Sequence, residues 1–447
     1  MDDDLRISGV GSRAEAALRL TAAPVFAERH AAAPAGNDIV QDNVVTSSRA
    51  GTVPAAVPSA AAASAGAQPA PTVWVLKCHR AGDHAQSLAL ANELGWPYVV
   101  KDMEFHWYEL FFALADKVSL AGFDRRRSSP LTPPWPDLVI MAGRRNEIPA
   151  RWIRAQSAGR TKVVVIGRYW TPPKDLDLVV TTPQFRLPTH HGNVLLNDFP
   201  LHLASKQRLT EAGKLWAPRV AGLPGPYVTL LVGGSTGPYV FSRRTARRLG
   251  REASAFARAL GASLLVTTSA RTGRGAMQAL RAAIDVPCHF YQWRPRDPDN
   301  PYLGFLGLAD AVIATADSMS MIAEACMTDR PVYLFEFGNG PAAMHGPRAR
   351  DPQNRQWWRP SQLLDQGVAG LPYAWWIGRP ARRLNRSRDI RLVLDRYIAS
   401  GRAQWLSDEL LADPARVRKN AATTHAKPLE DVELAAQAVR RLLGLAA

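Results

Sequence analysis

Polar residues of a kind that binds nucleotides follow the apolar run 310–316. Asp317, Ser318 and Ser320 stand at the start of a predicted helix, and Glu324 lies about one turn further on. The first turn of a helix has free backbone N–H groups and a partial positive charge, which together with two hydroxyls suit a diphosphate. A carboxylate one turn later could accept hydrogen bonds from a ribose. The simpler alternative is that Asp317 only caps the helix.

Two further loops of the same half follow predicted strands. LLVGGSTG (230–237) brings glycines that let a backbone approach a phosphate, although the Gly-Lys-Ser/Thr of a Walker A loop is missing. VTTSARTGRG (266–275) brings a guanidinium that could pair with a phosphate. The alternatives are a tight turn and a solvated arginine. Together the three loops predict a donor site made of Gly234, Ser235, Thr236, Ser269, Arg271, Asp317, Ser318, Ser320 and Glu324.

The loop HRAGDHAQ (79–86) in the first half offers titratable groups. Asp83 or His79 could remove the proton from an acceptor hydroxyl, and we take both as candidate catalytic residues. Asp83 precedes a predicted helix, so a plain N-cap is the alternative. We expect Gln86, Arg144 and Arg168 to bind the acceptor, because all three fall near the carboxyl ends of predicted strands.

No metal or cofactor motif accompanies these residues. Cys78, Cys288 and Cys326 are far apart, which excludes a zinc spacing and a disulfide framework and favours a reducing compartment. The Asp-x-Asp pairs at 175–177 and 297–299 resemble a metal signature of another transferase fold. The first lies at the start of its predicted strand, the end of the sheet away from the expected site, so we reject it as a metal site. The GxSxG motif of α/β-hydrolases is absent, and no GxGxxG motif of nicotinamide dehydrogenases follows the first strand, so the sequence favours neither class of enzyme. We expect no metal, and no cofactor beyond a nucleotide-sugar co-substrate.

Strands and helices alternate twice along the chain, which predicts an α/β protein with two parallel sheets. The predicted strands of the first series are 73–76, 97–103, 137–143, 162–167 and 177–182, with helices at 87–95 and 148–159. A Pro/Gly linker near 217–226 separates the series. The second begins within 223–234, with a strand that ends before Gly233. Its other strands are 263–270, 289–293, 310–316 and 331–337, with helices at 244–261, 275–284, 300–309 and 318–329.

These patterns divide the chain into four parts. Residues 1–71 read as a disordered Ala/Pro-rich extension, 72–216 as a Rossmann-like acceptor domain and 217–380 as a Rossmann-like nucleotide-sugar domain. Residues 381–447 are expected to form helices that pack across both domains, with a cleft between them. The last helix has acidic residues in its first turn and arginines in its last, as the helix dipole favours.

The net charge of the chain is +16, and residues 1–71 hold five Arg against seven Asp or Glu, so the rest of the chain carries +18. Such a body is attracted to phosphate-rich partners, including anionic lipid. No stretch has the ~18 apolar residues that cross a bilayer, and the Asp-rich start is unlike a secretory signal. We expect a cytoplasmic protein that can attach peripherally to the inner membrane.

The chain resembles the elongated-mitochondria (ELM-type) mitochondrial fission proteins and their bacterial relatives over about residues 72–445. The most specific stretch is TADSMSMIAEAC followed by DRPVY. That family is similar to GT-B glycosyltransferases, so the resemblance implies two Rossmann-like domains facing a cleft, with Ser235, Ser318, Ser320 and Glu324 in the donor site. The sequence departs from the pattern in its Ser-Thr-Gly after Gly-Gly, in Gln184-Phe185 where His-Asp is expected, and in its extension. The resemblance therefore assigns no catalytic base.

We therefore predict a metal-independent glycosyltransferase of a bacterial cell-envelope glycan pathway. It would move a sugar from a nucleotide-activated donor to a glycan or lipid-linked acceptor at the cytoplasmic membrane face. A non-catalytic adaptor that recruits a membrane-remodelling partner is the alternative. Nucleic-acid binding is the weakest reading, because the basic residues are dispersed and no stacking motif appears, so we expect no nucleic-acid partner.

Overall fold

The computed structural model describes residues 69–445 except 107–117, 170, 172–175, 188, 190, 237–238, 339–343, 346–388 and 422–429. These residues belong to one contact unit, Asn37–Ala447. Nearly all of the predicted extension 1–71, and much of the region around 381, lie outside the described residues.

The first half holds a parallel six-stranded sheet in the order β2-β1-β3-β4-β5-β6. Its central strands are runs of Val, Ile and Leu buried on both faces, as a covered parallel sheet requires. Helix α1 (Ala81–Leu94) packs on one face and α3 (Glu147–Gln156) on the other. The strands are β1 (Val73–Leu76), β2 (Tyr98–Lys101), β3 (Leu138–Ala142), β4 (Lys162–Ile166), β5 (Leu178–Thr181) and β6 (Val194–Leu196).

The second half holds another parallel six-stranded sheet, in the order β12-β11-β10-β7-β8-β9. Its strands are β7 (Tyr227–Leu231), β8 (Ser263–Thr267), β9 (Cys288–Tyr291), β10 (Ala311–Thr315), β11 (Val332–Phe335) and β12 (Gln404–Trp405). The helices between them are α5 (Arg243–Leu260), α6 (Arg274–Arg281), α7 (Tyr302–Leu308) and α8 (Met319–Ala325). This is the Rossmann strand order, and it reverses direction between β7 and β10.

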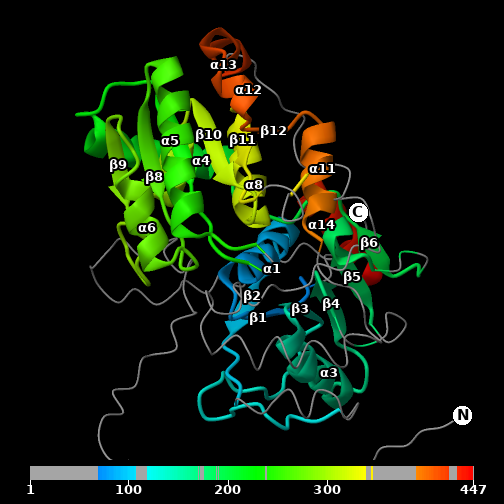
Figure 1. The fold of residues 1–447 in the computed structure, drawn as a ribbon. Helices are drawn as coiled ribbons and strands as arrows, with labels where there is room; N and C mark the ends of the chain where they lie inside the picture. The colour runs from blue at the N-terminus through cyan, green and yellow to red at the C-terminus, as the bar shows by residue number, and fades with distance from the viewer. Residues whose placement is uncertain are drawn as a thin grey trace, which may run out of the picture. The chain divides into compact units, whose positions relative to one another are not determined.

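The α/β class and the two Rossmann-like domains of a GT-B-like chain are thereby confirmed (Figure 1). Each predicted strand is present, but β6 and β12 were not predicted. The prediction of a linker at 217–226 is wrong for its first part, because helix α4 (Lys206–Val220) continues to Val220. Ser205 caps this helix by accepting a hydrogen bond from the Arg208 amide, and α4 packs closely on α7.

The C-terminal helices return to both sheets, as predicted. They are α11 (Arg391–Ala399), α12 (Asp408–Leu411), α13 (Pro414–Ala421) and α14 (Asp431–Leu442). Helix α13 packs on α5 of the second half, whereas α14 packs on α1 and buries Ala435 and Val439 in the core of the first half. The Asn197 amide donates to the Asp431 carbonyl at 2.9 Å, and the Asp431 carboxylate accepts the Phe199 amide at 3.1 Å.

Candidate nucleotide site

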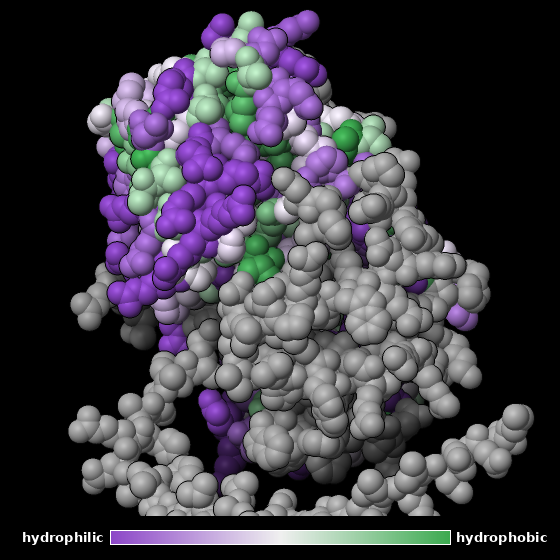
Figure 2. Space-filling model, in the orientation of Figure 1, coloured by the Kyte–Doolittle hydropathy of each residue, from purple (hydrophilic) through white to green (hydrophobic). Residues whose placement is uncertain are grey.

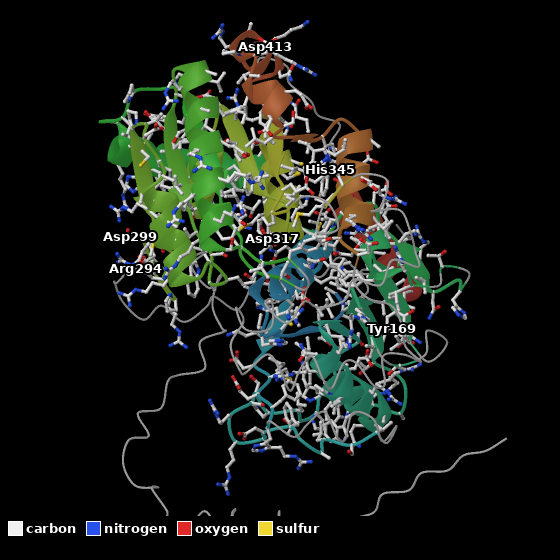
Figure 3. All side chains as sticks on the ribbon, viewed as in Figure 1. Tyr169, Arg294, Asp299, Asp317, His345 and Asp413 are labelled. Carbon is white, nitrogen blue, oxygen red and sulfur yellow. The ribbon has the colours of Figure 1, made fainter. Side chains whose placement is uncertain are left out.

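Three loops of the second half meet around the carboxylate of Asp317, at the carboxyl edge of the sheet (labelled in Figure 3). The carboxylate oxygen Oδ2 accepts the Gly234 amide at 3.0 Å and lies 2.6 Å from the Arg271 guanidinium. The same guanidinium donates to the Gly234 carbonyl at 3.1 Å. The loops after β7, β8 and β10 are therefore joined at the reversal point of the strand order, where such sheets bind ligands.

The two glycines are needed for this close approach. A Cβ atom at position 233 would stand 2.4 Å from the Asp317 carboxylate, and one at position 234 would stand 2.1 Å from the Arg271 carbonyl oxygen. Both distances are far below van der Waals contact, so any side chain would separate the loops.

Hydroxyl groups hold the loops in place. The Gly233 amide donates to Thr315 Oγ1 at 2.8 Å, and the Ser269 hydroxyl donates to the Gly233 carbonyl at 2.8 Å. The Thr272 hydroxyl also contacts that carbonyl. Thr315 was missed from the sequence, although a threonine at the last position of β10 was a usable signal, and Thr272 was noted in its loop but not assigned to the site. The loop backbone is thus fixed before any ligand arrives.

The predicted cap role of Asp317 is wrong. Ser318, not Asp317, is the N-cap residue of α8, and it makes no side-chain capping bond. The Asp317 carboxylate instead bonds the glycine loop and Arg271. Ser318 is buried, and Ser320 is half-buried in the first turn. A Cβ atom at Gly82 would stand 3.1 Å from the Ser320 hydroxyl, so the start of α1 lies against the start of α8.

Glu324 is buried and accepts a hydrogen bond from the Tyr302 hydroxyl. Burial raises the pKa of the Glu324 carboxyl to about 7, because desolvation outweighs the Tyr302 bond and the charge of Arg208. The carboxylate thus has a protein partner at the place where a ribose contact is predicted, and a ribose would have to share it.

Ser235 and Thr236 lie in the loop after β7 but turn toward their own loop. The Ser235 hydroxyl accepts the Phe241 amide at 3.0 Å, and Thr236 exchanges backbone hydrogen bonds with Tyr239. Both residues are half-buried. The structure therefore brings Gly234, Ser269, Arg271 and Asp317 into direct contact, with Ser318 and Ser320 adjoining and Glu324 further along α8.

The candidate base residues lie at the start of α1. Asp83 belongs to the first turn of α1 rather than preceding it, and Arg80 is the N-cap residue. Burial lowers the pKa of His79 to about 4, and the charges of Arg80 and Arg145 add to this. The imidazole is therefore unprotonated at neutral pH, and it is a weaker base than an ordinary histidine.

The predicted acceptor residues lie at the carboxyl edge of the first sheet. Gln86 lines a small pocket with residues that follow β4 and β5, and its amide lies 3.5 Å from the Gly82 carbonyl. Arg144 follows β3 in a short 3-10 turn and Arg168 follows β4, and both are half-buried.

Across the described part of the chain, no three His, Cys, Asp or Glu side chains gather as a metal-binding group. None of its helices combines the length and the apolar run that a bilayer crossing requires.

The two sheets and the loops joined at the second one define a two-domain α/β protein of GT-B-like type. A family model described as mitochondrial fission ELM1 matches residues 81–350. The chain therefore belongs to the mitochondrial fission ELM1 family.

Two curated relatives are similar to the chain. Mitochondrial fission protein ELM1 of Arabidopsis thaliana is 29% identical over 182 residues, which are 39% of this chain and 42% of that protein. The chain thus matches less than half the length of the plant protein. An uncharacterised protein of Rickettsia prowazekii is 22% identical over 305 residues, covering 59% of this chain and 82% of the relative.

Solved structures align at low identity. MurG of Acinetobacter baumannii is 13% identical at a TM-score of 0.38, with 83% of this chain and 99% of that chain covered. The UDP-GlcNAc 2-epimerase of Methanocaldococcus jannaschii is 9% identical at a TM-score of 0.42, with 83% and 98% covered. TM-scores below 0.5 do not by themselves establish a common fold, so the fold assignment depends on the two sheets.

Proposed function

We propose that the protein is a metal-independent glycosyltransferase that takes a nucleotide-sugar as donor. One observation supports this most: the loops after β7, β8 and β10 join through Gly234, Arg271 and Asp317 at the reversal point of the Rossmann sheet. Hydrogen-bond donors that are already in position where charge develops on the leaving diphosphate lower the barrier to sugar transfer.

Asp317 would act as a positioning residue in this proposal. Its buried carboxylate holds Arg271, whose side chain remains 38% exposed. A guanidinium has five N–H donors, so Arg271 can pair with Asp317 and still offer donors to a phosphate. His79 or Asp83 would accept the proton of a glycan or lipid-linked alcohol brought by the first half, at the cytoplasmic face of a membrane.

A second candidate function is a non-catalytic adaptor. It is favoured by the same carboxylate, since Asp317 already occupies the Gly234 amide and one edge of Arg271. A protein that never binds a diphosphate would keep the junction closed in this way.

Nucleotide-sugar titration separates the two candidates. The full chain should melt at a higher temperature with one member of a nucleotide-sugar panel, because a ligand that binds only the folded state stabilises it. Arg271→Ala should reduce that affinity by roughly 10- to 100-fold, the scale of a lost hydrogen bond to a charged group. Arg294→Ala, a change of another exposed arginine of the same half, is the matched control. A chain that ignores the whole panel would contradict the transferase and favour the adaptor.

A further inference from the structure

Helix α5 presents a row of arginines to solvent. Arg244, Arg247 and Arg251 follow one another at spacings of three and four residues, which places them on one face of the helix, and all three are exposed. Within the described residues, no acidic side chain forms an ion pair with Arg244 or Arg247, and Arg251 interacts only with the neighbouring Glu252, which itself pairs with Arg248. The row thus carries an excess of positive charge.

The row opposes the stability of its own helix. The first turn of α5 contains Arg243 and Arg244 and no acidic residue, so cations stand at the positive end of the helix dipole. Helix α14 has the favourable arrangement, with Asp431 and Glu433 in its first turn and arginines in its last. Like charges three and four residues apart also repel one another. An anionic partner outside the chain would relieve both costs.

The neighbouring helix α6 widens the row into a face. Arg243 lies across the start of α6, since a Cβ atom at Gly275 would stand 2.6 Å from its Nε, and α6 itself begins with the exposed Arg274. Figure 2 shows hydrophilic residues gathered over α5 and α6. We call this set the α5 basic face: Arg243, Arg244, Arg247, Arg251 and Arg274.

We propose that the α5 basic face adsorbs to membranes rich in anionic phospholipid. Helix α5 packs against both α6 and α13, so its arginines belong to a broad surface and do not stand on an isolated helix. The large exposed hydrophobic side chains of the described residues all lie on other elements, so this face has no ring on which single-stranded bases could stack. A broad cationic face without an apolar wedge suits a layer of phosphate headgroups. This proposal takes one point from the proposed function, which is that the acceptor lies at a membrane.

Vesicle sedimentation of the full chain tests this face. Phosphatidylcholine vesicles containing phosphatidylglycerol should bind the protein at low salt, and pure phosphatidylcholine vesicles should not. The triple variant R244Q/R247Q/R251Q should bind more weakly by about five-fold for each arginine removed. The matched control is R125Q/R126Q/R127Q, which removes three exposed arginines of the first half and changes the net charge equally.

Four outcomes would overturn the proposal: equal losses in both triple variants, no loss in the α5 variant, no binding to anionic vesicles, or binding to duplex DNA in place of vesicles. Free inorganic polyphosphate is a competitor in solution. If it binds while vesicles do not, the phosphate affinity has a soluble source and the membrane proposal fails. Melting of the α5 variant with the nucleotide-sugar panel should match the wild type, so failure of the face and failure of the transferase are distinguishable.

Discussion

Glu324 retains its proton further into the neutral range than an exposed glutamate does. Its pKa rises from 4.5 to about 7, so between these values the folded chain binds more protons than the unfolded chain. The stability that this proton contributes is present below pH 4.5 and is lost as the pH rises through 7. Over this pH range the free energy of unfolding falls by roughly 3 kcal/mol.

Glu324→Gln should remove this dependence, because the amide is neutral at every pH. We expect the variant to match the wild type near pH 4.5 and to exceed it in unfolding free energy above pH 7. Urea unfolding at a series of pH values measures the difference. Glu433→Gln, a change of an exposed glutamate on α14, is the control. Parallel pH curves for the Glu324 variant and the wild type would contradict the assigned cause.

At this scale the sequence predicted the residue types but not their partners. Gly-Gly after a strand and Asp-Ser before a helix are local signals, so Gly234 and Asp317 could be selected directly. Their contact joins residues 83 positions apart, and it depends on the β7 and β10 strands lying side by side. The Tyr302 partner of Glu324 lies on another helix and had no local signal.

At the scale of elements, the contact of α4 with α7 depends on two glycines. A Cβ atom at Gly307 would stand 2.0 Å from the Leu209 carbonyl oxygen, and one at Gly213 would stand 3.1 Å from the Gly307 backbone. The two helix backbones thus approach more closely than side chains would allow.

Gly307→Ala should lower the unfolding free energy by roughly 1–3 kcal/mol, as overpacking of a tight contact does. Gly222→Ala has no neighbour within 4 Å and should be neutral or slightly stabilising. Denaturant midpoints of the two variants give the comparison. An unchanged midpoint for Gly307→Ala would show that the helices can separate at little cost.

The elements that the sequence predicted are those with a strong pattern. Buried runs such as VVVI (163–166) and AVIAT (311–315) are recognisable as central strands. Strands β6 and β12 were missed because they have only three and two residues and are only partly buried. Helix α4 was missed because Pro218 stands inside it and suggested a linker.

At the scale of the whole molecule, α14 completes the core of the first half. Ala435 is fully buried there, whereas its neighbour Leu434 is 45% exposed. Ala435→Asp should therefore destabilise the first half by roughly 3–5 kcal/mol, the cost of an unpaired buried charge. Leu434→Asp is the matched control and should stay within about 0.5 kcal/mol.

Hydrogen exchange locates the effect of Ala435→Asp. Amides of β1 and β3 should exchange faster in the variant, while those of β7 and β8 should keep their protection, because α14 contributes to the first core and not to the second. Equal acceleration in both sheets would show instead that the two halves unfold as one unit.

The position of α14 also constrains how the protein is made. Domains usually fold in order of synthesis, starting from the N-terminus. Here the first sheet receives its last covering helix from residues 431–442, which leave the ribosome only after the second half has been translated. During elongation the nascent first half therefore exposes to solvent the apolar surface around Leu90 that α14 later covers. A chaperone that holds this surface until release would raise the yield of native protein.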